Sequence, residues 1–476
     1  MWVSDHPSGS VVIISQVDQV RGDLPVLWLV GLGLTVALFT VQPWALTVYQ
    51  VPLQVLLVWL LLGWFGLFRL PKISRLWNPY PLVHWVVIAI FLCGIATQNL
   101  VEGRSWLRFQ QICTGIALAF ISAQAVTSLR GRRALVLALT SAATTSSVIA
   151  LLQSRGMADW SWGGTLYDGL WVRIPSGLES FPVAYSYSVV GIGIVLLGSG
   201  FHDLKNSERL SLFPPRMALV CGGIILLGNV AALSRSGVLA IIVGVTLLAM
   251  GMWYIKRRFI LVTYLTVGLF VLVGLVSVDR ITFLDRLYDK SKQAEQDMRM
   301  GATFTLFTPV ILQYPLGIPE SVLNLEIHLR TPSNSAMRNT TKELKEAFVM
   351  SEGYEPHNLF LSIGLRYGVP GIIALGVIYY VLINRAVIVL RRIHPSSKPR
   401  ISVLVVIFLV ANVGLLVHAF FHNASILAGE MRGWIWIGVL SILTKMQGEQ
   451  NRFDHLSDCP DRHIVADVEV QCSTEC

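Results

Sequence analysis

The sequence predicts an all-α polytopic membrane protein with about twelve transmembrane helices. Of its 476 residues, 54% are hydrophobic and only 14% are charged, whereas soluble domains carry roughly 25% charged residues. The apolar residues fall in repeated runs of about 20, the length that an α-helix needs to cross the hydrocarbon of a bilayer. These observations exclude a soluble protein of two or three domains, because so few charges cannot coat several separate surfaces.

The apolar runs form two groups of spans, separated by one long external segment before the tenth span. The predicted spans are 24–42, 51–68, 82–97, 109–128, 134–152, 183–200, 216–233, 237–255, 259–277, 359–383, 401–421 and 427–444. They give an N-terminal membrane bundle of about nine spans (1–277), an external loop (278–358), a C-terminal bundle of about three spans (359–444) and a tail expected to be disordered (445–476). Within the loop, residues 298–314 are amphipathic enough to form a helix on the membrane surface.

The basic residues predict which side of the membrane each loop occupies. With the N-terminus in the cytoplasm, twenty-one of the 37 lysines and arginines fall in cytoplasmic segments and seven in the short external ones. This excess follows the positive-inside rule, so the protein is expected in the cytoplasmic (inner) membrane with both termini in the cytoplasm. The net charge of +9 is explained by this orientation. The lipid bilayer is therefore an expected partner, and nucleic acid is not.

The sequence lacks the common signatures of nucleotide- and metal-dependent proteins. It has no P-loop, no glycine-rich dinucleotide motif, no zinc-binding HExxH and no Asp-x-Asp pair of the kind that holds a divalent metal on a diphosphate. Its six cysteines have no metal-ligand spacing. No predicted span carries a central Asp or Glu, as ion-coupled transporters commonly do. No metal and no cofactor are therefore expected.

Arginines recur at or near the external face of the predicted spans. Arg235, directly after Ser234, lies between two long apolar runs, where a charge usually has an anionic partner. Arg173, Arg299 and Arg366 fall on the same predicted side. Several guanidiniums on one side of a membrane could bind a pyrophosphate, because their planar forks pair with phosphate oxygens. Alternatively, Arg235 only marks a short external turn and Arg173 is an exposed loop charge.

One histidine is predicted at the junction between membrane and water. The segment Pro356-His357-Asn358 begins the tenth span, and proline suits the first turn of a helix. Histidine titrates near neutrality and could accept a proton from a sugar hydroxyl. A single interfacial histidine can also be purely structural. His418 and His422, near the external end of the eleventh span, are left out of the predicted site for that reason.

These two motifs resemble those of the O-antigen ligase and O-antigen polymerase superfamily. The segment Arg235-x3-Leu239 is similar to the superfamily's arginine motif. His357-Asn358, followed after nine residues by Gly368, resembles its histidine motif.

Three further features follow the order found in that superfamily. Residues 313–317, Gln-Tyr-Pro-Leu-Gly, resemble its His-Pro-Leu-x-Gly segment, and Arg299 stands ahead of them as the second arginine does. Upstream, Arg173-x3-Gly177 resembles the stretch that precedes a span. The resemblance covers roughly residues 165–385 in motif order.

The resemblance implies a GT-C-like membrane glycosyltransferase of the cell envelope that is metal-independent and inverting. Its donor would be a glycan on polyprenyl (undecaprenyl) pyrophosphate, and its acceptor a sugar, lipid or protein hydroxyl at the external face. The implied site consists of His357 as the catalytic residue, Arg235, Arg299 and Arg173 as ligands of the donor pyrophosphate, and Asn358 and Ser234 as supporting residues.

Several functions remain open from the sequence. A ligase moves a finished polysaccharide and a polymerase extends a repeat unit, and the shared motifs do not separate the two. A membrane transporter and a non-catalytic polysaccharide-assembly factor of the same architecture are the alternatives outside this enzyme class.

Overall fold

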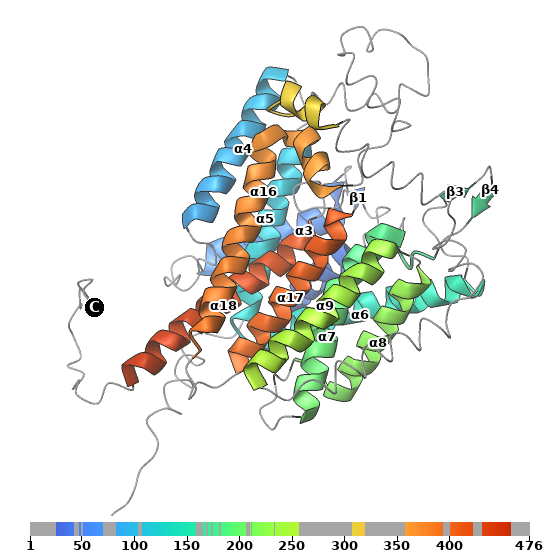
Figure 1. Ribbon diagram of the computed structural model, residues 1–476, viewed down its shortest axis with the longest axis vertical. Helices are drawn as coiled ribbons and strands as arrows, with labels where there is room; N and C mark the ends of the chain where they lie inside the picture. Colours follow the sequence, from blue (N-terminus) through green and yellow to red (C-terminus); the bar gives the residue numbers. More distant parts are fainter. Residues whose placement is uncertain are drawn as a thin grey trace, which may run out of the picture.

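A computed structural model shows the chain as a bundle of long helices (Figure 1). The structure describes residues 25–41, 47–48, 51–69, 82–102, 107–158, 165–167, 170–172, 175–179, 182–205, 210, 212–232, 234–256, 307–318, 358–393, 400–421 and 431–457. The ninth predicted span, 259–277, lies outside these residues.

The remaining eleven predicted spans each lie on one described helix. These helices are α2 (Val26–Val41), α3 (Leu53–Arg69), α4 (Leu82–Glu102), α5 (Leu107–Val126), α6 (Leu129–Ser154), α7 (Pro182–Lys205), α8 (Pro215–Ala231), α9 (Arg235–Lys256), α16 (Leu359–Arg391), α17 (Arg400–Phe420) and α18 (Gly433–Ser457). In the described part of the chain, five helices are long and apolar enough to cross a membrane, on α5, α6, α7, α16 and α17. Five shorter apolar helices lie on α2, α3, α4, α8 and α9.

Two small departures from the predicted all-α class occur at connections between helices. The strands β1 (Thr47–Val48) and β2 (Val51–Pro52) pair antiparallel just before α3. The strands β3 (Thr165–Tyr167) and β4 (Leu170–Val172) pair antiparallel between α6 and α7. Both hairpins are too short to add a layer, so the described architecture is that of a helical, polytopic membrane protein.

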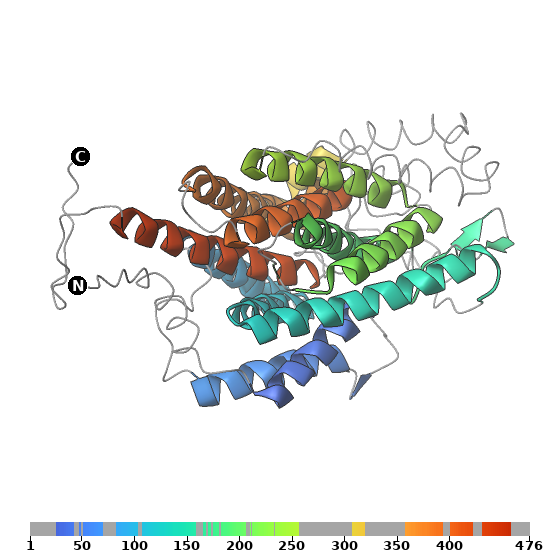
Figure 2. The ribbon, with the colours of Figure 1, turned by 90° about the horizontal axis from the view of Figure 1, so that it is seen from below.

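The core of the bundle is built around α7 and α17. α7 contacts α6, α8, α9 and α17, while α17 contacts α7, α9, α16 and α18. The side chains of α7 are buried without a break from residue 185 to 200. α2 and α3, blue in Figure 2, cover the side of the bundle opposite α9. α6 lies between this pair of helices and α9, and it contacts α2.

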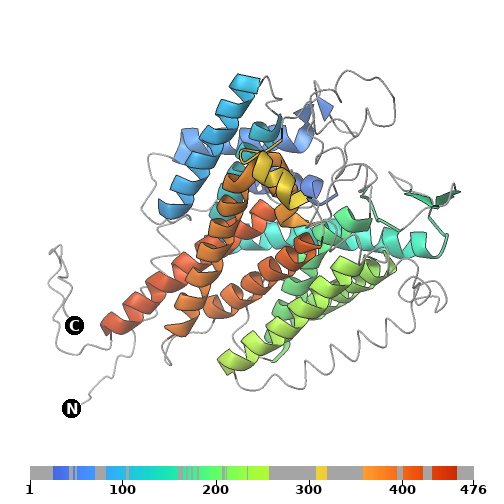
Figure 3. The ribbon, with the colours of Figure 1, turned by 45° about the horizontal axis from the view of Figure 1, so that its top comes forward.

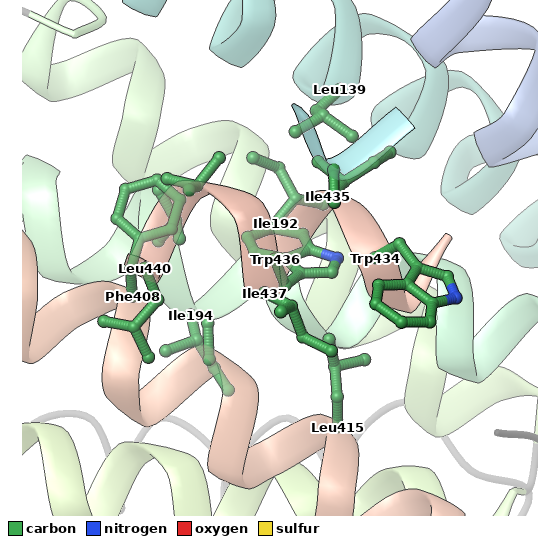
Figure 4. Packing of buried hydrophobic residues seen from close by; sticks show 14 of the residues in the cluster. Leu139, Ile192, Ile194, Phe408, Leu415, Trp434, Ile435, Trp436, Ile437 and Leu440 are labelled. Carbon is green, nitrogen blue, oxygen red and sulfur yellow. The ribbon is translucent and has the colours of Figure 1, made fainter. Parts of the chain in front are cut away.

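Large aromatic side chains of α18 fill the space beside these central helices. Trp436 lies 5.9 Å from the ring of Phe408 on α17, centroid to centroid. Figure 4 shows the same indole next to Ile192 and Ile194 of α7. Trp434 and Trp436 are both almost completely buried. Since lipid chains are as apolar as leucine, such close packing is a main source of helix association inside a membrane.

Helix ends that are predicted to share one side of the membrane meet in the structure. At the predicted external end, the side-chain amide of Asn358 donates to the carbonyl of Phe420 over 3.4 Å. At the opposite end, the side-chain amide of Asn451 donates to the carbonyl of Val389 over 3.1 Å. Figures 1 and 3 show the start of α16 near the end of α17. This is the pairing of ends that alternating spans produce.

Two elements near the C-terminus extend further than the spans predicted there. α16 continues to Arg391, and α18 continues to Ser457. The segment expected to be a disordered tail from residue 445 is therefore helical over its first part. Residues 298–306 of the predicted amphipathic helix lie outside the described residues, but 307–313 are helical.

Candidate functional site

The predicted site residues fall unevenly on the described chain. Ser234 and Asn358 are described, and both are buried. Arg235 is the first residue of α9, although its side chain lies outside the described part. Arg173, Arg299 and His357 are also outside it. The geometry of the site is therefore given by the residues next to these four.

The arginine motif forms the capped start of α9. The hydroxyl oxygen of Ser234 accepts a hydrogen bond from the backbone N–H of Gly237 over 3.3 Å. Serine is a favourable cap because it satisfies an N–H group that has no partner within the helix. On the other side of Arg235, the hydroxyl of Ser236 lies 3.3 Å from Nε2 of His418 on α17. The backbone of Arg235 is thus fixed between two buried serines.

The histidine motif is fixed in a similar way at the start of α16. Oδ1 of Asn358 accepts hydrogen bonds from the backbone N–H groups of Phe360, over 3.0 Å, and Leu361, over 3.2 Å. Asn358 is therefore the N-cap, and Pro356 precedes the helix rather than lying in its first turn. These contacts, with the bond to Phe420, give Asn358, the residue after His357 in the sequence, a structural task.

The end of α17 joins these two motifs. His418 contacts Ser236 beside Arg235, and the carbonyl of Phe420 accepts from Asn358 beside His357. His418 and Phe420 are two residues apart on one turn. The structure therefore brings Ser236 and Asn358, which are 122 positions apart in the sequence, to the same turn of α17.

The third motif, residues 313–317, docks on a break in α16. At Gly368 the helix adopts φ 66° and ψ −160°, a left-handed conformation that glycine tolerates without steric cost. The backbone N–H of Val369 donates to the carbonyl of Pro315 over 2.9 Å, and the N–H of Ile318 donates to the carbonyl of Leu365 over 2.7 Å. These bonds replace the one that Val369 and Leu365 would share in an unbroken helix.

Glycines permit the close approach of these two segments. A side chain at Gly368 would collide with the carbonyl group of Pro315, and one at Gly317, where φ is 96°, would collide with the carbonyl of Arg366. The short helix at 307–313, yellow in Figures 1 and 3, seals the contact with Phe307, Val310 and Ile311. Two motifs that are far apart in the sequence are thus one structural unit.

A buried ion pair lies next to the arginine motif. Nη1 of Arg432, directly before α18, is 2.5 Å from Oε1 of Glu179, directly before α7. Both side chains are almost completely buried. The same guanidinium lies 5.8 Å from the centroid of the Tyr187 ring, and that ring contacts the imidazole of His418 edge to face at 5.6 Å. A chain of buried polar and aromatic groups therefore connects the ion pair to Ser236.

Sequence reasoning missed this chain of contacts. His418 is left out of the site predicted from the sequence, and neither Glu179 nor Arg432 is part of that site. The partners of the ion pair are 253 residues apart. No spacing in the sequence predicts their contact. In the sequence, an apolar run follows each of the two residues, at 183–200 and 433–443.

The turn that carries Glu179 is held by α6. Oε1 of Gln153 accepts from the backbone N–H groups of Ser176 and Gly177, both over 2.9 Å. Gly177 has φ 62°. The hydroxyl of Ser146 accepts from the N–H of Leu178 over 3.0 Å. These bonds hold residues 176–178, which follow Arg173 in the sequence, against the C-terminal part of α6.

The described residues offer neither a metal site nor a polar cavity beside these motifs. Among the described residues, no cluster of three His, Cys, Asp or Glu side chains could hold a metal ion. A cavity of about 510 Å³ lies between α3, α4 and α5, lined by apolar side chains such as Trp59, Trp85 and Phe120. It shares no residue with the motifs described above.

A comparison with known families finds a match over the part of the chain that carries these motifs. Residues 219–376 match the O-antigen ligase family, Wzy_C. The match confirms the resemblance to the O-antigen ligase and polymerase superfamily, and it contains the arginine motif, the 313–317 segment and the histidine motif. It covers about a third of the chain and ends before α17 and α18. A comparison with curated proteins finds no match.

The docking at Gly368 can be tested by adding a single methyl group. We expect Gly368→Ala to lower the melting temperature of the detergent-solubilised protein, because alanine is strained at this φ by about 1–2 kcal/mol and would also meet the carbonyl of Pro315. The matched control is Gly376→Ala on the same helix, where a Cβ would have no neighbour within 4 Å. Equal melting temperatures for the two variants would contradict the docking.

The buried ion pair makes a second prediction. Glu179→Gln should destabilise the protein by about 3–5 kcal/mol, because it leaves the charge of Arg432 buried without compensation. Thermal unfolding in detergent measures the change, and Arg216→Gln, on the exposed start of α8, is the control for losing one charge. The double variant Glu179→Gln/Arg432→Gln should recover part of the loss. A stability of Glu179→Gln equal to that of the control would show that the pair contributes nothing.

Proposed function

We propose that the protein is a membrane glycosyltransferase of the O-antigen ligase or polysaccharide polymerase type. It would transfer a glycan from polyprenyl pyrophosphate to a hydroxyl at the external face of the cytoplasmic membrane. The observation that carries the proposal is the meeting of the arginine and histidine motifs at one turn of α17, within a segment that matches the O-antigen ligase family.

In the proposed reaction, cations of the protein stabilise the leaving group. Arg235 and Arg299, with Arg173, would bind the donor pyrophosphate and neutralise the negative charge that it gains as it departs. The position of Arg235 at the start of α9 supports this role. Unpaired N–H groups and the helix dipole both favour an anion at a helix N-terminus.

His357 would act on the acceptor. The acceptor oxygen attacks the anomeric carbon, its proton passes to the imidazole, and the bond between that carbon and the pyrophosphate oxygen breaks with its electron pair leaving on the pyrophosphate. Attack from the face opposite the leaving group inverts the anomeric configuration. General-base catalysis of this kind contributes about 10²–10⁴ in rate.

The surroundings of the proposed site are suited to holding both substrates in place. Ser234 caps α9, which begins at Arg235, and Asn358, the residue after His357 in the sequence, caps α16. The break at Gly368 is satisfied by the 315–318 segment, which holds α16 at Leu365 and Val369 by backbone hydrogen bonds. A rigid frame reduces the reorganisation that a transition state requires.

The proposed base makes the first prediction for function. In a deletion strain, His357→Ala should insert normally but fail to restore glycan transfer, because the acceptor hydroxyl loses its base. Surface glycan and carrier-linked intermediates would be resolved by size, with the wild-type gene as control. Long polymer accumulating on the carrier would indicate a ligase, and single repeat units would indicate a polymerase. Unchanged surface glycan and carrier pools would contradict the proposal.

The proposed role of Arg235 as a ligand of the pyrophosphate makes a second prediction for function. Arg235→Lys should reduce transfer at least about tenfold, because a single ammonium does not replace the two parallel hydrogen bonds of a guanidinium fork. The control is Arg216→Lys at the start of α8, where the same exchange lies on the surface. Transfer by Arg235→Lys at the rate of the control would show that Arg235 contributes only its charge or its place in the turn.

A further inference from the structure

A second cavity lies at the end of the bundle opposite Asn358. It measures about 810 Å³ and is formed between the C-terminal part of α16 and α18. Three cations line it, namely Arg385 and Arg392 from α16 and Lys445 from α18, together with one carboxylate, Glu449. Glu449 interacts electrostatically with Arg385. Among the described residues that line the cavity, cations therefore outnumber carboxylates.

The position of the cavity along α16 corresponds to the headgroup region of a bilayer. α16 begins at Leu359, and about 20 helical residues cross the roughly 30 Å of hydrocarbon. Arg385 and Arg392 lie beyond that length, on the side that the basic residues predict to be cytoplasmic. Basic cavities between transmembrane helices on this side are typical sites for anionic lipid headgroups.

The cavity has an apolar wall on the lipid-facing side of the helix. Ile388 lines the cavity and is 39% exposed on the surface of the protein. Ile373 and Tyr380, also exposed, precede it on α16 at intervals of seven and eight residues. That spacing places the three side chains on one face of the helix. A lipid chain lying along this face would lead directly to the cations.

The other wall is held in shape by hydrogen bonds. The side-chain amide of Gln447 donates to Oδ1 of Asn451 over 2.8 Å, and Asn451 donates to the carbonyl of Val389 across to α16. Ser402 of α17 donates to Gln447 over 3.0 Å. These bonds tie the three helices around the cavity, so little ordering is needed when a ligand binds.

We propose that this cavity binds the headgroup of an anionic phospholipid. Its phosphate would lie between Arg392 and Lys445, and one acyl chain would follow the exposed face of α16 past Ile388 and Tyr380. A lipid fits better than a soluble anion, because the cationic wall is continuous with an apolar, membrane-facing surface. The site is separate from the proposed transfer site and does not depend on that function.

The test is lipid binding to the full-length purified protein. Delipidated protein in detergent would be titrated with phosphatidylglycerol and with phosphatidylcholine of the same chains, and bound lipid would be counted by native mass spectrometry. Wild type should prefer phosphatidylglycerol. Arg392→Gln/Lys445→Gln should weaken phosphatidylglycerol binding about thirtyfold, at about a factor of five for each cation near a membrane surface.

A matched control removes the same charge elsewhere. Arg391→Gln/Arg216→Gln changes two exposed arginines that do not line the cavity, and it should keep the preference of the wild type. Equal losses in the two double variants would overturn the proposal in favour of general charge attraction. If Arg392→Gln/Lys445→Gln does not fold, Arg392→Gln alone, at an exposed position, should still weaken binding about fivefold.

The same experiment distinguishes a phospholipid headgroup from a soluble phosphate as the ligand of the cavity. Inorganic phosphate and a short-chain, water-soluble glycerophosphate would be added as competitors at millimolar concentration. The lipid should remain bound, because the acyl chain contributes contacts that the soluble anions lack. Complete displacement by inorganic phosphate would overturn the assignment to a lipid and leave a soluble-anion site. Wild-type binding that does not distinguish the two phospholipids would overturn it entirely.

Discussion

Every break in a helix of this bundle must find its hydrogen bonds within the protein, because hydrocarbon offers none. The break at Gly368 exposes the carbonyl of Leu365 and the N–H of Val369, and the 315–318 segment satisfies both. The turn before α7 is satisfied by Gln153 and Ser146. In each case the hydrogen bonds come from a segment distant in the sequence, so they also determine which segments lie together.

This constraint explains why the sequence motifs occur where they do. Helix starts and breaks are the places where backbone groups and polar side chains gather inside an otherwise apolar bundle. The buried ends of α9 and α16 need caps, and Ser234 and Asn358 provide them. The residues proposed for chemistry, Arg235 and His357, immediately follow and precede these caps. The residues that cap the two helices are thus direct neighbours, in the sequence, of the residues proposed for chemistry.

The helices could be predicted from the sequence because the pattern that indicates them, a long apolar run, is local. Eleven predicted spans lie on described helices, since an apolar run of about 20 residues is visible without knowledge of its neighbours. The predicted start at 359 agrees with α16, but the sequence suggests Pro356 in the first turn, whereas Asn358 is the cap and Pro356 precedes the helix. The extra length of α18 was missed because its last turns are polar and resemble a tail.

The site was predictable only as separate motifs. Arg235 and His357 were each recognised from neighbouring residues and from family resemblance. The two motifs are joined through His418 and Phe420, whose contacts with Ser236 and Asn358 are long-range. The ion pair of Glu179 and Arg432 was not foreseen for the same reason, because residues from separate loops meet only when the bundle has formed.

The distribution of positive charge follows from these contacts. Arginines on the predicted external side run against the positive-inside preference, so each needs a compensating interaction or a task. Arg432 has the carboxylate of Glu179 and the face of Tyr187. On the opposite side, Arg385, Arg392 and Lys445 follow the preference and outnumber their carboxylate. The buried external charge of Arg432 is thus neutralised within the fold, whereas at the other end cations outnumber carboxylates among the described residues that line the cavity.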